Sequence, residues 1–107
     1  MPLIAWSIFL AAAVMEVGGD ALIRRGLRGG GLALIVAGFG VLGFYGLTVN
    51  MVRWDFSRLL GVYVGVFAVV SVLAGRLLFG ERIAGPTWIG LCLIVAGGLV
   101  IQTGGRL

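Results

Sequence analysis

The stretch FLAAAVMEVGGD, Phe9 to Asp20, decides how this chain folds, because it places acidic residues inside the first apolar segment. The segment opens at Pro2, so at 1.5 Å of rise per residue Glu16 would lie roughly 20 Å along a helix that crosses about 30 Å of hydrocarbon. We therefore predict that Glu16 lies within a membrane. A carboxylate at that depth costs on the order of 2.5 to 3.5 kcal/mol, so we expect it to face a bundle interior or a wet cavity.

A buried glutamate has a chemistry that suits transport. Burial disfavours the charged form of a carboxylate, whereas a cation that enters the same cavity favours it. A proton and a cation can therefore compete for one site at Glu16, which is the minimal chemistry of a proton-coupled cation exporter. The structural alternative is that Glu16 is paired with an arginine or with backbone donors.

The composition predicts an all-α integral membrane protein. Of the 107 residues 61% are hydrophobic and 11% are charged, against roughly 25% charged residues in a soluble domain. Four long runs without charge are each near the roughly 17 to 25 residues that a spanning helix needs. We predict a single four-helix transmembrane domain, residues 1–107, with helices at about residues 2–23, 32–52, 58–79 and 86–103.

The net charge of +4 comes from eight arginines against four acids. In a membrane protein an excess of arginine is usually related to the orientation of the chain in the membrane and to contact with lipid headgroups. We therefore expect no nucleic-acid partner. Histidine is absent and Cys92 is the only cysteine, so no zinc site of the usual spacing is possible, and we expect no metal and no cofactor. We expect the protein in the inner (plasma) membrane, as a multi-pass protein.

Three further residues are candidates for a cation cavity around Glu16. Asp20 follows one turn later on the same helix and is either an exit-side acid or a paired one. Tyr45 on the second helix and Tyr63 on the third can attract a cation to their ring faces, although a tyrosine in a membrane helix is more often packed with its hydroxyl satisfied. Gly61 and Gly65 flank Tyr63 in a small-xxx-small pattern, and we assign them to close approach and flexibility of the third helix.

A dimer is implied by the size of the chain. Four short helices can pack on one another, but they can hardly enclose a substrate chamber as well. The two sides of the membrane differ by only two arginines, which leaves open the insertion of the chain in both orientations. An antiparallel, dual-topology dimer would have its two-fold axis in the membrane plane and would obtain alternating access from exchange of the protomers' conformations.

Three segments resemble the small multidrug resistance family: AVMEVG around Glu16 (13–18), FGER (79–82) and GLCLIVAG (90–97). The resemblance covers essentially the whole chain. It implies an antiparallel dimer of four-helix chains, with Glu16 as the essential glutamate that proton and substrate share. It also implies a dimer seam on the fourth helix, formed by Gly90, Leu93, Ile94 and Gly97. The chain departs from the family pattern at several positions: Tyr63-Val64-Gly65 stands at the helix 3 signature and is followed by Phe67, Leu60 and Gly43 replace a tyrosine and a serine, and Asp20 is an extra acid.

Our leading hypothesis is a proton-coupled antiporter that exports small organic or hydrophobic cations. Glu16 would bind the proton or the cation in turn, with Tyr63, Tyr45 and Asp20 beside it. Two alternatives remain: a passive dual-topology ion channel, and one subunit of a heterodimer with a paired homologue. The helices offer no pair of nucleophile and base, so we do not expect an enzyme. The substrate stays open between guanidinium, quaternary ammonium, polyamine and other cations.

Overall fold

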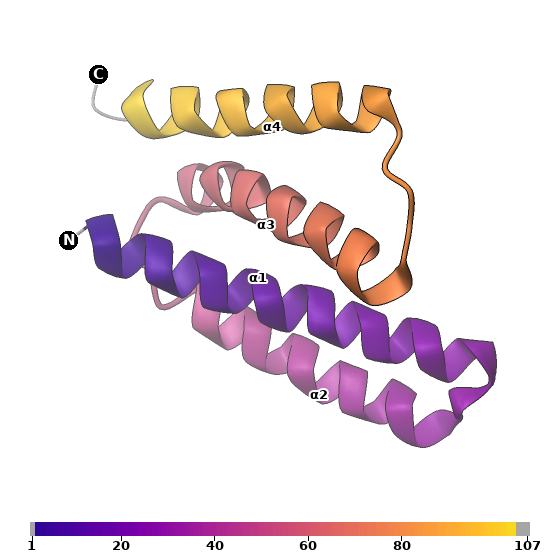
Figure 1. Cartoon of the computed structure of the whole chain (residues 1–107). Coiled ribbons are helices and arrows are strands. Elements are labelled where there is room, and N and C mark those ends of the chain that lie inside the picture. Colours follow the sequence, from indigo (N-terminus) through magenta and orange to yellow (C-terminus); the bar gives the residue numbers. More distant parts are fainter. Residues whose placement is uncertain (1, 105–107) are drawn as a thin grey trace. The chain divides into compact units, whose positions relative to one another are not determined.

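The computed structural model describes residues 2–104, and its regular structure is helical throughout (Figure 1). Met1 and residues 105–107, which the predicted domain includes, lie outside this described range. Each of the four long helices is long and apolar enough to cross a membrane, which confirms the predicted all-α, four-span class. The helices are α1 (Pro2–Arg25), α2 (Leu32–Val49), α3 (Phe56–Phe79) and α4 (Gly85–Gly104), with a wide turn, η1 (Gly26–Gly30), after α1.

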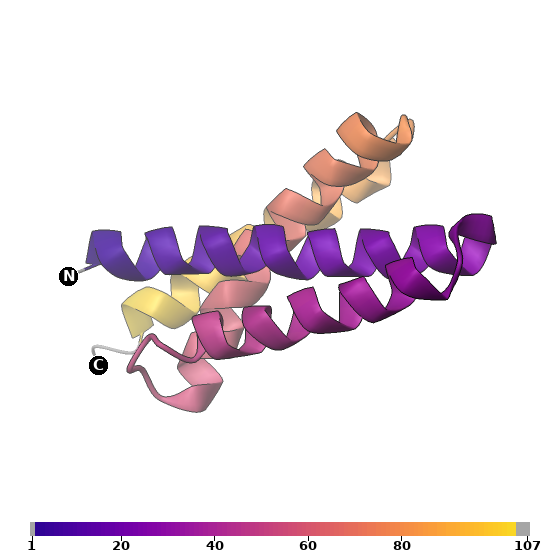
Figure 2. The same cartoon turned by 90° about the horizontal axis from the view of Figure 1, so that it is seen from below.

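The chain divides after Val52 into two compact units, one formed by α1 and α2 and the other by α3 and α4. In the first unit α1 and α2 run side by side in opposite directions (Figures 1 and 2). Their backbones come close where Gly19 faces Gly38: a Cβ added at Gly38 would lie 2.7 Å from the carbonyl oxygen of Gly19. Only a residue without a side chain permits this approach, which is how small residues bring membrane helices together.

Glycines also make the turn between α1 and α2. α1 continues through Arg24 and Arg25, two residues beyond its predicted end, because arginine is a good helix former and the breaking residues begin only at Gly26. Gly29 and Gly31 have φ values of 104° and 100°, a region that favours glycine. The amide of Gly31 donates to the carbonyl oxygen of Gly26 at 3.2 Å, which closes the turn.

The predicted second helix, 32–52, is three residues too long, because α2 ends at Val49. The side-chain amide of Asn50 donates to the carbonyl oxygen of Gly46 at 2.8 Å. The amides of Met51 and Val52 then bond three residues back, to Thr48 and Val49. Asparagine competes for backbone groups in this way and favours helix ends, so the chain leaves the helical path here although it stays apolar.

α3 begins at Phe56, two residues before the predicted start at Arg58. Asp55 stands at the N-cap position, with ψ 141°, and its carbonyl oxygen accepts the amide of Leu59 at 2.8 Å. The Asp55 side chain makes no capping hydrogen bond. Within the same unit, the Arg58 guanidinium lies 4.0 Å from the centre of the Trp54 ring, a cation–π contact.

α3 ends at Phe79, where the prediction placed it, through a glycine cap. Gly80 is left-handed, with φ 64°, and the amide of Glu81 donates to the carbonyl oxygen of Gly75 at 3.1 Å. A left-handed glycine of this kind is a common helix ending, and the bond satisfies a carbonyl oxygen near the end of α3. α4 then extends one residue beyond its predicted range of 86–103 at each end.

The second unit is packed through glycines on both of its helices. A Cβ added at Gly98 of α4 would lie 3.6 Å from the carbonyl oxygen of Val62, and one added at Gly65 of α3 would lie 3.8 Å from the Cα of Val95. Gly61 faces the side chain of Ile101. The pattern that predicted close approach on the third helix therefore falls on the face that meets α4, while the flexibility assigned to Gly61 and Gly65 stays a prediction.

Candidate functional site

Glu16 lies in the middle of the most buried stripe of α1. Phe9, Ala12, Ala13 and Gly19 are buried, and the helical repeat of 3.6 residues puts all four on the same side of the helix as Glu16. Glu16 itself is half-buried. It stands about 21 Å from the first residue of α1 and about 14 Å from the last. The small residues beside it leave the carboxylate without crowding from bulky neighbours on its own helix.

The register of α1 against α2 brings Tyr45 level with Glu16. Gly19 contacts Leu42, Ile23 contacts Gly38, and Gly26 contacts Ile35, so that steps forward along α1 are matched by steps back along α2. Continuing this register toward the start of α1 sets Tyr45 opposite Glu16. Tyr45 is half-buried and lies within electrostatic reach of both Glu16 and Asp20. The structure thus brings together three of the four predicted cavity residues, Glu16, Tyr45 and Asp20.

Asp20 differs from Glu16 in its exposure. It follows four residues later on α1 and is exposed, whereas Glu16 is half-buried. Asp20 is also nearer to the arginines of the last turn of α1, Arg24 and Arg25. The two acids therefore form a short series along one face of α1, running from the middle of the helix toward its basic end.

Open space lies on α2 next to Tyr45. A Cβ added at Gly46 would meet no atom within 4 Å. Gly18 of α1 is equally open, but it is two residues from Glu16 and so lies on the other side of that helix. Just beyond Tyr45, the Thr48 hydroxyl approaches the Met15 sulfur at 3.9 Å and ties the two helices together on the N-terminal side of Glu16. An added group would therefore meet no other atom within 4 Å at Gly46, one residue from Tyr45.

Tyr63, the fourth predicted cavity residue, belongs to the other unit. It is buried on α3, with only 3% of its surface exposed, and its ring centre lies 6.3 Å from that of Phe67. Its proximity to Glu16 stays a prediction. Its burial shows that this tyrosine is an integrated part of its helix packing and not a surface residue.

The predicted dimer seam of α4 lies largely on the outside of the α3–α4 unit. Leu93 is 69% exposed and Ile94 is 41% exposed. A Cβ added at Gly90 or Gly97 would meet no atom within 4 Å. Within the unit it is instead Gly98, one residue further along, that faces α3, so the seam is free of α3 along most of its length.

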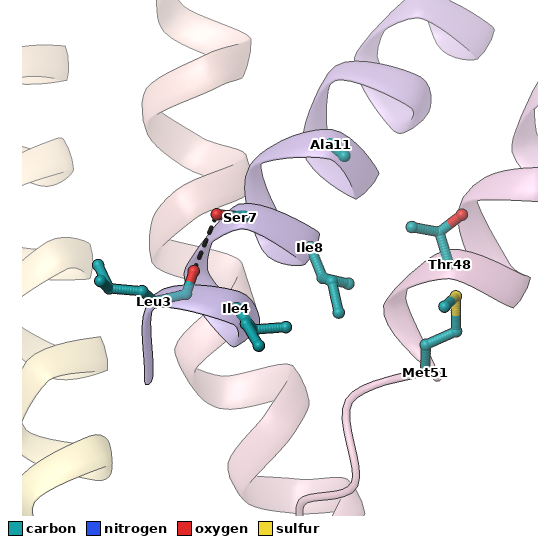
Figure 3. A pocket seen from close by; sticks show the side chains of 7 residues that line it. All are labelled: Leu3, Ile4, Ser7, Ile8, Ala11, Thr48 and Met51. Carbon is teal, nitrogen blue, oxygen red and sulfur yellow. Dashed lines mark hydrogen bonds between the residues drawn. The ribbon is translucent and has the colours of Figure 1, made fainter. Parts of the chain in front are cut away.

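The sequence did not indicate an apolar groove in the first unit, which Figure 3 shows. The groove encloses about 360 Å³ between the first turns of α1 and the end of α2. The Ser7 hydroxyl, its polar group from α1, is occupied by a hydrogen bond of 2.8 Å to the carbonyl oxygen of Leu3. Ser7 lies half a helical revolution from Glu16, so the groove is on the far side of α1 from the acid. Its lining residues are Leu3, Ile4, Ser7, Ile8, Ala11, Thr48 and Met51.

Among the described residues, Glu16, Asp20 and Tyr45 are not part of a metal site. In the part of the chain that the structure describes, 2–104, no three histidine, cysteine, aspartate or glutamate side chains gather closely enough to hold a metal ion. The arrangement of one half-buried acid, one exposed acid and one tyrosine suits the reversible binding of protons and organic cations.

Comparison with known proteins places the chain among membrane proteins. The family model described as "Uncharacterised BCR, YnfA/UPF0060 family" matches residues 3–107. A UPF0060 membrane protein of Mycobacterium marinum is 37% identical over 97 residues, which cover 89% of this chain and 88% of the relative. One of Saccharopolyspora erythraea is 38% identical over 97 residues, with the same two shares. A third, from Clavibacter sepedonicus, is 36% identical over 102 residues, covering 92% and 90%.

No solved structure matches the chain. The names of the relatives and the four apolar helices agree that this is a multi-pass membrane protein. The family description assigns no activity. The resemblance of the motifs to small multidrug resistance transporters therefore stays a prediction.

Proposed function

The chain belongs to the YnfA/UPF0060 family of membrane proteins, and from that premise we propose that it is a proton-coupled antiporter that exports small organic cations. The observation that carries the proposal is the position of Glu16: half-buried, in the middle of a membrane-spanning helix, and opposite Tyr45. Acids in such positions are costly and mark ion or proton pathways.

The proposed cycle uses one carboxylate for two competing ligands. With the site open to the proton-rich side, Glu16 takes up a proton and the cation leaves. With the site open to the other side, a cation displaces that proton because its charge favours the ionised carboxylate. The Tyr45 ring offers a face to the cation, and the space at Gly46 admits it. Because either ligand satisfies the acid, the empty charged state is the costly one, and this couples the two fluxes.

We further propose that two chains form the transporter, as an antiparallel homodimer. The support is the largely exposed seam of α4, whose two open glycines allow close packing of a second helix. A dimer of opposed protomers would provide the alternating access that four helices alone do not supply. The alternative assembly is a heterodimer, in which a paired homologue takes the place of the second copy. A cation exporter driven by protons needs an energised membrane, so we place it in the inner (plasma) membrane.

The proposal is tested by Glu16→Gln in reconstituted vesicles, because this change keeps the size of the side chain and removes its titration. With an imposed proton gradient, wild-type protein is expected to move a quaternary ammonium probe against its concentration gradient. Glu16→Gln is expected to abolish that movement. Glu81→Gln is the matched control: the same chemical change at an exposed acid in the α3–α4 loop, expected to leave transport unchanged.

Two results would contradict the proposal. Unimpaired proton-driven flux in Glu16→Gln would show that the acid is structural. Probe movement or current that ignores the proton gradient in the wild type would identify a passive channel. The dimer is tested separately, by crosslinking single-cysteine variants in native membranes, for which the lone Cys92 is first replaced.

A further inference from the structure

The apolar groove of the α1–α2 unit lies apart from the proposed exchange at Glu16, and its hydroxyl groups are already engaged. The Ser7 hydroxyl donates to the carbonyl oxygen of Leu3 at 2.8 Å, and the Thr48 hydroxyl approaches the Met15 sulfur at 3.9 Å. The other side chains that line the groove are apolar. Ordered water needs about two to four polar partners, so the groove suits an apolar occupant.

The groove has the length and the depth of a lipid chain. It follows α1 from Leu3 to Ala11, about 12 Å of helix, and one leaflet supplies half of the roughly 30 Å of hydrocarbon in a bilayer. Ile4 and Ile8 point from α1 toward the end of α2 (Figure 3). Leu3 is 75% exposed and Met51 is 66% exposed, so the groove opens to the surroundings of the hairpin. An extended acyl chain that enters from this face of the membrane would lie along it.

The mouth of the groove, at the start of α1, attracts negative charge. α1 has 24 residues and no acidic residue in its first turn, so its own side chains do not compensate the partial positive charge of its N-terminus. Arg53 is exposed and follows Met51 by two residues. The two peptide units that join these residues keep their Cα atoms within about 7.6 Å of each other. Both features favour an anion at the level of the lipid headgroups.

A second copy of the chain would bring the wrong charge to this mouth. Because the chain has four spans, a parallel copy would place its α2–α3 connection there, with Arg53 and Arg58 against Asp55. An antiparallel copy would place its other two connections there, whose charged residues, with those of the helix ends beside them, are Arg24, Arg25, Arg28, Arg76, Glu81 and Arg82. Either copy adds net positive charge, whereas an anionic headgroup brings the opposite sign.

We propose that the groove binds one anionic phospholipid, with an acyl chain along α1 and the phosphate group near the N-terminus of α1 and Arg53. Lipid chains contact the outer faces of all membrane helices, but this site selects the headgroup as well as the chain. The proposal does not depend on the proposed transport, since it requires only that α1 and α2 span the membrane.

The experiment compares phosphatidylglycerol with phosphatidylcholine of the same acyl chains, so that only the headgroup and its charge differ. Purified full-length protein in detergent is titrated with each lipid, and bound lipid is counted by native mass spectrometry. The wild type is expected to bind one phosphatidylglycerol per chain about tenfold more tightly than phosphatidylcholine, because an arginine and a helix N-terminus both act on the charge.

A photoactivatable phosphatidylglycerol locates the bound chain. With a diazirine in its acyl chain, it is expected to label Ile4, Ile8 and Met51 in vesicles, and unlabelled phosphatidylglycerol is expected to compete more strongly than phosphatidylcholine. Labelling of the exposed Phe39 and Phe44 on α2 gives the level of ordinary lipid contact, which is expected to be lower and insensitive to the headgroup of the competitor.

Variants of the arginine test the headgroup contact. Arg53→Gln is expected to lower the preference for phosphatidylglycerol about fivefold, the effect of one basic residue near an anionic headgroup. Its affinity for phosphatidylcholine is expected to stay unchanged, which also shows that the groove is intact. Arg28→Gln, the same change at an exposed arginine in the turn after α1, is the matched control and is expected to keep the preference.

A variant of the deep end tests the acyl-chain contact. Ala11→Phe is expected to weaken the binding of both lipids about tenfold and to leave their ratio unchanged, since the added ring takes the place of roughly two methylene groups of the chain. Ala11 is exposed, so the ring is not forced between the helices. Ala37→Phe, at an exposed position of α2, is the control and is expected to bind both lipids as the wild type does.

Four outcomes overturn the inference. The first is equal affinity of the wild type for the two lipids, and the second is an equal loss of preference in Arg53→Gln and Arg28→Gln. The third is labelling of Phe39 and Phe44 as strong as that of the groove, which would show ordinary lipid contact. The fourth is full lipid binding in Ala11→Phe together with crosslinks from the groove to a second chain, which would make that chain the occupant.

Discussion

The two units of the chain are both helical hairpins, but they distribute their chemistry differently. The α1–α2 unit contains both acids that lie within spanning helices, Glu16 and Asp20, with Tyr45 opposite. The α3–α4 unit has its acids, Asp55 and Glu81, outside its helices. It contributes an apolar packing seam and the buried Tyr63. Under the proposed function, the first hairpin would bind the ligands, while the second would supply the surface on which two chains assemble.

The hairpins also differ in how closely their backbones approach. At Gly38 an added Cβ would lie 2.7 Å from a backbone oxygen of α1, whereas at Gly98 it would lie 3.6 Å from the nearest backbone oxygen of α3. The first value is below ordinary contact and the second is within it. In the unit that contains the acids, backbone contact therefore fixes the register between the two helices. In the α3–α4 unit the backbones leave room for a methyl group at Gly98.

The largest expected effect is that of Gly38→Leu, which should prevent the α1–α2 hairpin from packing. The added side chain meets the Gly19 backbone, which cannot turn aside as a flexible side chain can. Overpacking typically costs about 1 to 3 kcal/mol and occasionally more, and we expect a value at or above the upper limit here. Unfolding in mixed detergent and denaturant measures the loss. Gly40→Leu, on the same helix with open space around it, is the control; equal loss in both variants would refute the argument.

A smaller effect is expected when the ring of Tyr45 is removed. Tyr45→Leu should lower the affinity for butyltrimethylammonium by roughly three- to tenfold, since a cation–π contact contributes about 0.5 to 2 kcal/mol depending on exposure. Tyr45→Phe keeps the ring and should retain most of the affinity. Phe39→Leu, which removes a ring that is 66% exposed on α2, is the control. If Tyr45→Leu binds as well as the wild type, the ring is not part of the site.

Gly97→Leu should affect assembly and not the fold of a single chain. A side chain added there meets nothing within 4 Å, but it would fill the seam that a second copy is proposed to occupy. We expect a shift from dimer toward monomer by a factor of about ten, equivalent to about 1.4 kcal/mol. Single-molecule photobleaching in lipid at several protein-to-lipid ratios measures it, with Gly43→Leu, at an open position of α2, as the control. An unaltered dimer fraction would place the interface elsewhere.

The smallest effect is expected for Gly98→Ala. The added methyl group would stand in ordinary contact with α3, at 3.6 Å, and alanine is favoured over glycine in a helix by up to about 1 kcal/mol. We expect unchanged or slightly increased stability toward denaturant. The same substitution at Gly38 should be clearly destabilising. Equal responses at the two positions would remove the difference in tightness between the hairpins.

Much of the fold followed from linear patterns. The lengths of the apolar runs predicted four spanning helices, and the predicted end of the third, residue 79, is where α3 ends. The helix ends that differed did so for local reasons: Arg24 and Arg25 prolong α1, while Asn50 ends α2 before the apolar run does. Propensity and competing hydrogen bonds decide such ends, and hydropathy does not register them.

The candidate site was only partly accessible from the sequence. Glu16 is identifiable because an acid in an apolar run is rare and costly. Tyr45 was a candidate for the same cavity, but its place opposite Glu16 could not be predicted, because that depends on the register between α1 and α2. A chain with 20 glycines offers many candidate contact faces, and no one-dimensional pattern selects among them. The groove near Ser7 was missed for the same reason, since it arises between two helices.

The sequence by itself determined that the chain is a helical membrane protein with an acid in mid-span, because the hydrophobic effect and the cost of charge in hydrocarbon act on each segment independently. Only the tertiary structure decided that Gly19 meets Gly38, that Tyr45 consequently stands opposite Glu16, and that Asp20 remains exposed beside them. Steric fit between two surfaces chooses those partners, and such fit exists only once both helices are in place.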